Sequence, residues 1–108
     1  MKAQPAFEVV TLAGELDIAR KEELHRALFV EAEMRGVLVD LSDVTYADST
    51  ALTELLRFRM HAEQHGLPVA VVVNGPQLDR IIRYAGLHEV FDIFENRGDA
   101  MAHLERAS

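Results

Sequence analysis

The amino-acid sequence predicts an α/β fold: a single domain over residues 1–108 with a mainly parallel β-sheet of four to five strands, covered by amphipathic helices. Two observations carry this prediction. Short runs of apolar and β-branched residues alternate with longer segments whose apolar residues recur at helical spacing. The connections are short, and glycine or proline stands near the expected ends of the elements. Such alternation joins parallel strands through right-handed crossovers.

The first strand is expected over residues 7–12. Gly14-Glu15-Leu16-Asp17 then leads into a helix over residues 21–34, which glycine at position 36 is expected to end with a left-handed C-terminal cap. Charged residues occupy the other faces of this helix, as an amphipathic cover requires. Its expected apolar stripe consists of Leu24, Ala27, Leu28 and Ala32.

The middle of the chain predicts a buried strand over residues 37–41, because four of these five residues are apolar and only an aspartate interrupts them. A loop over residues 42–48 then leads to a second helix over residues 49–65. Gly66 and Pro68 are expected to end this helix. Its buried stripe is expected to comprise Leu52, Leu55, Leu56 and Met60.

The last third of the chain predicts two further strands and two further helices. Residues 69–73 form the clearest buried strand, because all five are apolar. A helix over residues 76–84 begins with proline at its first position, where the missing N–H costs nothing. A short strand over residues 91–94 and a final helix over residues 98–106 complete the order β-α-β-α-β-α-β-α.

Composition excludes several classes of function. The chain has no cysteine, which excludes disulfides, thiolate catalysis and cysteine-bound zinc. Its formal charge is −7, and the 11 basic residues are scattered, which argues against nucleic-acid binding. Apolar runs are too short to span a bilayer, and the N-terminal residues lack the apolar core of a secretory signal. We therefore expect a cytoplasmic protein without direct membrane insertion.

Catalytic and metal-binding interpretations are weak. The sequence contains no glycine-rich phosphate loop and no nucleophile elbow, so we expect no enzyme. His61 and His65 could face one metal ion, but a solvated polar face near the helix C-terminus is the better interpretation. Asp40, Asp43 and Asp48 could hold a divalent cation such as magnesium at the carboxyl end of a strand. The alternative is that Asp43 and Asp48 bond their own loop, as in Asx turns and helix caps.

The most informative segment is Asp48-Ser49-Thr50-Ala51-Leu52, where a strand connection becomes a helix. Asp48 or Ser49 is a good N-cap, and capping alone would explain the segment. A second interpretation is a phosphoacceptor, because a serine at a helix N-terminus is exposed and its phosphate is tolerated by the free N–H groups. Periodicity does not decide between the two.

Four ordered segments together resemble a STAS domain, the fold of bacterial anti-sigma factor antagonists. The resemblance covers nearly the whole chain. Each segment alone is a weak signal, while the ordered set is specific for the fold. The segments are Gly14-Glu15-Leu16-Asp17, Val39-Asp40-Leu41-Ser42-Asp43-Val44, Asp48-Ser49-Thr50-Ala51-Leu52, and Tyr84-Ala85-Gly86-Leu87 followed by Val90-Phe91.

The resemblance implies partner switching. The unphosphorylated protein would bind an anti-sigma factor that is also a serine kinase with an ATPase domain of the histidine-kinase type. This binding would free a sigma factor. Phosphorylation would release the antagonist, and a phosphatase would reset it. Ser49 matches the phosphorylated serine of the family, and Thr50 is the weaker candidate. The implied partner-binding surface comprises Gly14, Glu15, Leu16, Asp17, Asp48, Ser49, Thr50, Ala51 and Leu52.

The chain departs from the family pattern at Ala51, where glycine is usual, and at Thr53, where a small residue is common. An added methyl group is compatible with a helical first turn, but it restricts close backbone approach by a partner. The resemblance also permits an alternative function. STAS domains serve as cytoplasmic subunits of lipid-transporting ABC complexes, where the same surface packs against the ATPase subunit. The resemblance implies no cofactor and no metal for the domain itself.

Overall fold

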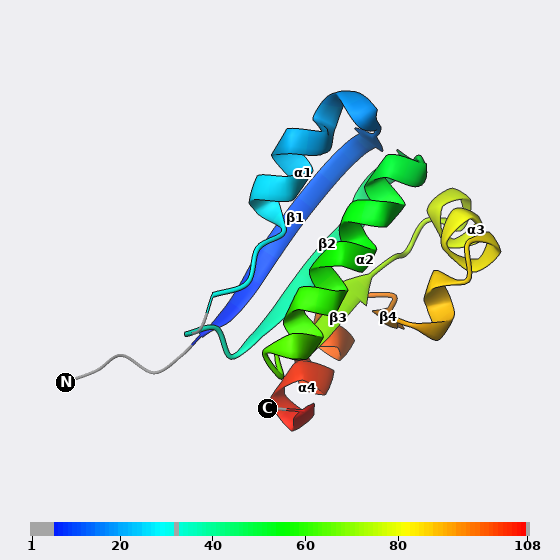
Figure 1. Cartoon of the computed structure of the whole chain (residues 1–108). Coiled ribbons are helices and arrows are strands. Elements are labelled where there is room, and N and C mark those ends of the chain that lie inside the picture. Colours follow the sequence, from blue (N-terminus) through cyan, green and yellow to red (C-terminus); the bar gives the residue numbers. More distant parts are fainter. Residues whose placement is uncertain (1–5, 32, 108) are drawn as a thin grey trace.

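The structure, a computed structural model, describes residues 6–31 and 33–107. In this part of the chain, four parallel strands lie in the spatial order β1-β2-β3-β4 (Figure 1). The predicted α/β fold class is therefore confirmed. The strands are β1 (Phe7–Leu16), β2 (Gly36–Ala47), β3 (Val69–Val72) and β4 (Asp92–Phe94). The helices are η1 (Ile18–Arg20), α1 (Lys21–Ala27), α2 (Ser49–Gln64), α3 (Pro76–Tyr84), η2 (Leu87–Glu89) and α4 (Arg97–Ala107), of which η1 and η2 are 3₁₀-helices.

The sheet separates two apolar layers. Alternate residues of the central strands face opposite sides, so Val39 packs into the larger core with Phe58 of α2, while Leu38 packs into the smaller core with Leu104 of α4. Helices α1, α2 and α3 contribute to the larger layer, and α4 covers the other face (Figure 1). Because β2 is covered on both faces, its first half is an apolar run that only Asp40 interrupts.

The predicted loop over residues 42–48 is wrong, because residues 42–47 continue β2. Strand β1 is also longer than predicted and extends through Gly14 to Leu16. The two extensions pair with each other, since Leu16 lies opposite Ala47 in the parallel register. The exposed polar residues of these extensions give a sequence pattern typical of a loop, because this end of the sheet projects beyond the cover of α4. Pairing between distant strands, which no local pattern reveals, keeps the segments extended.

Helix α1 is shorter than predicted and ends at Ala27. The connection must return along the whole of β1 before a parallel β2 can begin, a distance of about 30 Å. A helix over residues 21–34 would supply only about 20 Å, so the chain leaves the helix early and runs back to Arg35, whose N–H donates to the carbonyl of Ala6 at 3.1 Å. Ala32 of the predicted stripe lies outside the described residues.

Gly36 does not cap α1, contrary to the prediction. It is the first residue of β2, and positive φ angles occur instead at Gly14, Gly66 and Gly86. A Cβ atom on Gly36 would lie 2.9 Å from the ring of Phe7, so close packing explains the glycine. The left-handed conformation of Gly66, with φ of +63°, is consistent with its predicted role in ending α2.

Helix α2 presents a different face to the core from the one predicted. Leu55 is buried as expected, but Met60 is 58% exposed, and that prediction is wrong. Leu52 and Leu56 are half-buried. The fully packed positions are Ala51, Glu54, Leu55, Phe58 and Ala62, which recur every three or four residues. Within the described residues no helix is both long enough and apolar enough to cross a membrane.

Candidate functional site

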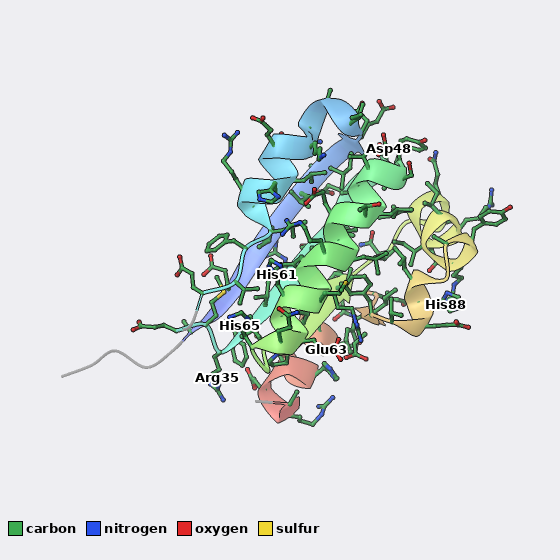
Figure 2. The ribbon with its side chains drawn as sticks, viewed as in Figure 1. Arg35, Asp48, His61, Glu63, His65 and His88 are labelled. Atoms are coloured by element: carbon green, nitrogen blue, oxygen red, sulfur yellow. The ribbon has the colours of Figure 1, made fainter. Side chains whose placement is uncertain are left out.

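The junction between β2 and α2 places Ser49 at the first position of the helix. Asp48 is the N-cap: its Oδ1 accepts a hydrogen bond from the N–H of Ala51 at 3.0 Å. This confirms Asp48 as the predicted cap. Figure 2 shows Asp48 at the start of α2, at the carboxyl ends of β1 and β2. The Ser49 residue itself is exposed.

Asp48 also joins the two segments of the predicted docking surface. Its second oxygen, Oδ2, accepts a hydrogen bond from the N–H of Ile18 at 3.1 Å, and its own N–H donates to the carbonyl of Leu16 at 3.0 Å. Both carboxylate oxygens are therefore engaged with backbone donors. The structure brings the segments of residues 14–17 and 48–52 side by side, although about thirty residues separate them in sequence.

The side chains of the two segments divide between surface and core. Ser49 and Glu15 are exposed, whereas Leu16 and Ala51 are fully buried. Thr50 is half-buried, which makes its hydroxyl less accessible than that of Ser49. Leu16 and Ala51 can support the surface only by holding their exposed neighbours in place.

The hydroxyl of Ser49 forms no hydrogen bond within the part of the chain that the structure describes. Its backbone carbonyl accepts from the Thr53 hydroxyl at 2.8 Å, a bond within the first turn of α2. Helix N-termini carry partial positive charge and unsatisfied N–H groups, which favour an anion. A phosphoryl group on the Ser49 oxygen would therefore meet a favourable local field from the helix and an unfavourable one from Asp48.

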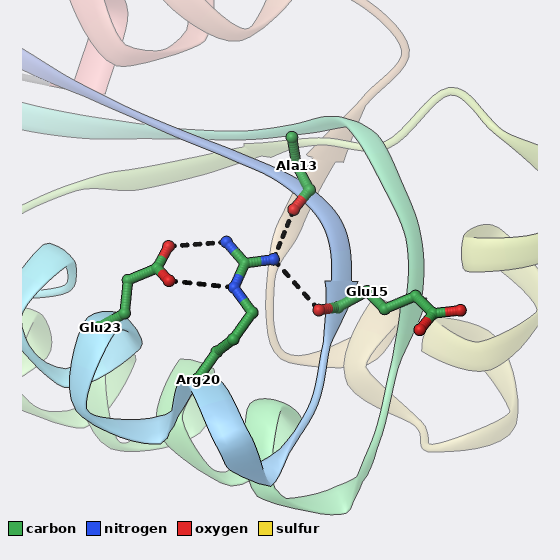
Figure 3. A network of polar contacts seen from close by, with 4 residues as sticks. All are labelled: Ala13, Glu15, Arg20 and Glu23. Atoms are coloured by element: carbon green, nitrogen blue, oxygen red, sulfur yellow. Dashed lines mark hydrogen bonds and ion pairs between the residues drawn. The ribbon is translucent and has the colours of Figure 1, made fainter.

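Arg20 holds the end of β1 from its outer edge (Figure 3). Its Nη1 donates to the carbonyls of Ala13 at 2.6 Å and Glu15 at 3.1 Å, while the carboxylate of Glu23 accepts from Nε at 3.0 Å and from Nη2 at 2.6 Å. The left-handed Gly14 lies between the two carbonyls, at an irregularity in the strand register. The hydrogen bond from Arg20 lowers the pKa of Glu23.

This role of Arg20 is not evident from the amino-acid sequence. The available signal was local: an arginine three residues before a glutamate, at the start of a helix. That spacing predicts the ion pair but not the two carbonyl contacts, which require the backbone irregularity at Gly14.

Asp40, Asp43 and Asp48 do not converge on a common site. Asp40 is buried within β2 and accepts hydrogen bonds from the N–H and hydroxyl of Ser42 and from Arg97 of α4. Burial raises the pKa of Asp40, but the bonds from Ser42 and Arg97 outweigh this effect and lower it. Asp43 is exposed, and Asp48 caps α2. The capping interpretation is therefore confirmed for Asp48, whereas no hydrogen bond to the Asp43 carboxylate is found among the described residues.

His61 and His65 lie near the C-terminal end of α2 (Figure 2). The ring Nδ1 of His65 lies 2.8 Å from the carbonyl oxygen of His61, a contact that ties this ring to the end of the helix. In residues 6–31 and 33–107, no three histidine, aspartate or glutamate side chains are grouped so that they could hold a metal ion.

Comparison with known proteins places this geometry in a family. Residues 1–100 match the STAS domain. An anti-sigma F factor antagonist of Paenibacillus polymyxa is 28% identical over 104 residues, which cover 93% of this chain and 88% of that protein. The crystal structure of an anti-sigma factor antagonist from Mycobacterium paratuberculosis superposes with a TM-score of 0.84 at 26% identity, covering 92% of this chain and 86% of the other.

The same fold also occurs outside anti-sigma factor antagonists. A sulfate transporter family protein from Wolinella succinogenes has a TM-score of 0.77 at 18% identity, covering 94% of this chain and 86% of that one, a likeness of fold alone. The family match spans nearly the whole sequence and agrees with the observed sheet order and helix positions. The chain therefore belongs to the STAS domain family.

Proposed function

We propose that this STAS domain is an anti-sigma factor antagonist whose binding is controlled by phosphorylation of Ser49. The unmodified protein binds an anti-sigma factor, which frees a sigma factor, and the phosphorylated protein lets go. The observation that carries the proposal is the exposed Ser49 hydroxyl at the start of α2, on a junction fixed by Asp48. The relatives named as anti-sigma factor antagonists support the same role.

The partner that fits this cycle is an anti-sigma factor serine kinase with an ATPase domain of the histidine-kinase type. The kinase supplies ATP and magnesium, and the Ser49 oxygen attacks the γ-phosphorus while ADP leaves. A phosphatase restores the hydroxyl by hydrolysis. The STAS domain then contributes only the acceptor and the docking surface. This division of labour is consistent with a site that offers an exposed hydroxyl beside carboxylates already engaged in hydrogen bonds.

Charge explains how one phosphate would end the complex. Phosphorylation adds roughly −1.5 to −2 charges at pH 7. Asp48 precedes Ser49 directly, and Asp17 caps the neighbouring 3₁₀-turn by accepting from the N–H of Ala19 at 3.1 Å. The phosphate would have to lose water beside these carboxylates when a partner covers them. A penalty of about 3 kcal/mol weakens binding about 100-fold, without any rearrangement of the domain.

The proposal is tested by incubating the protein with the kinase and ATP and locating the phosphate by mass spectrometry. We expect phosphate on Ser49, none in Ser49→Ala, and an unchanged yield in the matched variant Thr50→Ala. Ser49→Ala should also remain bound to the kinase in the presence of ATP. Phosphate at another residue with Ser49 unmodified would contradict the acceptor assignment. Stable co-purification with a transporter ATPase would contradict the antagonist role.

A further inference from the structure

Ile18 exposes an unusual amount of apolar surface beside the Ser49 junction. It is 70% exposed, more than any other large aliphatic residue that the structure describes. The large apolar residues exposed in this part of the chain are Val9, Ile18, Phe29, Tyr46, Met60, Tyr84 and Val90. Of these, Ile18 is bonded through its own backbone N–H to Asp48, the residue before Ser49. An exposed isoleucine therefore lies in direct contact with the proposed docking surface.

The turn that carries Ile18 is held by hydrogen bonds on each side of it. The N–H of Ile18 donates to Asp48 Oδ2 at 3.1 Å, and the N–H of Ala19 donates to Asp17 Oδ1 at 3.1 Å. The N–H of Arg20 donates to the carbonyl of Asp17 at 3.0 Å, which closes the 3₁₀-turn. The backbone of Ile18 is therefore tied both to its own turn and to the start of α2.

Arg20 adds a further restraint on the strand that precedes the turn. Its guanidinium bridges the carbonyls of Ala13 and Glu15 and is itself oriented by Glu23 (Figure 3). Because this backbone is already fixed, covering it with a partner costs little further backbone ordering, so more of the burial of the side chain appears as affinity. Isolated exposed apolar residues are ordinary on protein surfaces, but this one combines exposure, fixed presentation and proximity to Ser49.

We propose that Ile18 is an apolar anchor of the docking surface and inserts into an apolar pocket of the anti-sigma factor. This inference rests on the proposed function and names the chemistry of its partner. Asp17 and Asp48 flank Ile18, and Glu15 is exposed nearby on β1, so carboxylates border the anchor on this side, while Arg20 is paired with Glu23. The complementary partner surface is an apolar pocket bordered by lysine or arginine side chains.

The inference is tested by isothermal titration calorimetry with purified anti-sigma factor kinases of the source genome. Ile18→Ala should weaken binding about tenfold or more, as truncation of a buried interface anchor does. Ile18→Val should stay within about threefold of the unchanged protein, because most of the apolar surface remains. The matched control is Met60→Ala, which removes an exposed apolar side chain eleven residues beyond Ser49 on α2. It should leave affinity unchanged.

Thermal unfolding separates loss of contact from loss of fold. Ile18 and Met60 are both largely exposed, so neither alanine variant should shift the melting temperature measurably. If Ile18→Ala binds as tightly as the unchanged protein, while phosphorylation of Ser49 still abolishes binding, the proposed anchor role of Ile18 is refuted and the proposed function stands. If no kinase binds the unmodified protein, the proposed function and the anchor are both refuted.

Discussion

Asp48→Ala is expected to destabilise the domain more than removal of any other exposed or half-buried carboxylate. The substitution deletes the N-cap of α2, which contributes about 1 kcal/mol. It also deletes the bond to the Ile18 N–H, for which a charged acceptor contributes about 1.5 kcal/mol. Because the Asp48 carboxylate is partly exposed and partly solvated, we take a combined loss of about 2 kcal/mol.

This loss converts into a measurable shift in melting temperature. Unfolding entropy near 60 °C is roughly 2.1 cal/mol/K per residue, or about 0.23 kcal/mol/K for this chain, so 2 kcal/mol lowers the melting temperature by about 9 °C. Differential scanning calorimetry of the purified variant measures it directly. The melting temperature of Asp48→Asn should lie between those of the unchanged protein and Asp48→Ala, because the amide oxygen of asparagine can still accept one of the two hydrogen bonds.

Asp43→Ala is the matched control, because Asp43 is an exposed aspartate on β2, five residues before Asp48, and its carboxylate accepts no hydrogen bond from any other described residue. It should melt within about 1 °C of the unchanged protein. Equal melting temperatures for Asp48→Ala and Asp43→Ala would refute the argument that Asp48 joins the two segments of the docking surface.

Three further variants follow from the same contacts. Ser49→Ala should change the free energy of unfolding by less than about 0.5 kcal/mol, since its side chain is exposed, yet incorporate no phosphate in a kinase assay. Gly14→Ala should lower the free energy of unfolding in urea by about 1–2 kcal/mol, because φ is +77° there while the nearest atom, Nη1 of Arg20, leaves room at 3.7 Å. Arg97→Gln should lower it by about 1–2 kcal/mol at pH 7, because Asp40 is buried while Arg97 is half-exposed. The folded pKa of Asp40 lies below its unfolded value near 4, so this stabilisation is present above pH 4 and is lost as pH falls through the folded pKa. The difference in free energy of unfolding between Arg97→Gln and the unchanged protein should therefore disappear in acid. A difference that persists would contradict the stabilising role assigned to the Asp40–Arg97 ion pair.

The order of elements could be predicted because the buried strands are short uninterrupted apolar runs. Residues 69–73 illustrate this: a strand covered on both faces has no polar alternation to obscure it. The extension of β2 over residues 42–47 could not be predicted in the same way. Polar residues at positions 42, 43 and 45 interrupt its apolar pattern, and the segment is held extended by pairing with the end of β1, a contact between segments thirty residues apart.

The candidate site was predictable where it depends on local chemistry. An aspartate before a helical segment is a common N-cap, and Asp48 fills that role. The bond from the Ile18 N–H to Asp48 and the contacts of Arg20 with β1 were not predictable, because both require the folded arrangement of two distant segments. At Gly36 the local pattern was misleading. The glycine was predicted to end a helix, but it is needed because a side chain at this position would collide with the ring of Phe7.

The most direct test of phosphorylation-controlled binding is the affinity of one protein in two covalent states. The protein is phosphorylated to completion by its anti-sigma factor kinase, separated from the unmodified form, and each form is titrated into fresh kinase in a calorimeter. We expect the unmodified form to bind about 100-fold more tightly, the fold-change that corresponds to about 3 kcal/mol. Equal affinities for the two forms would contradict the account.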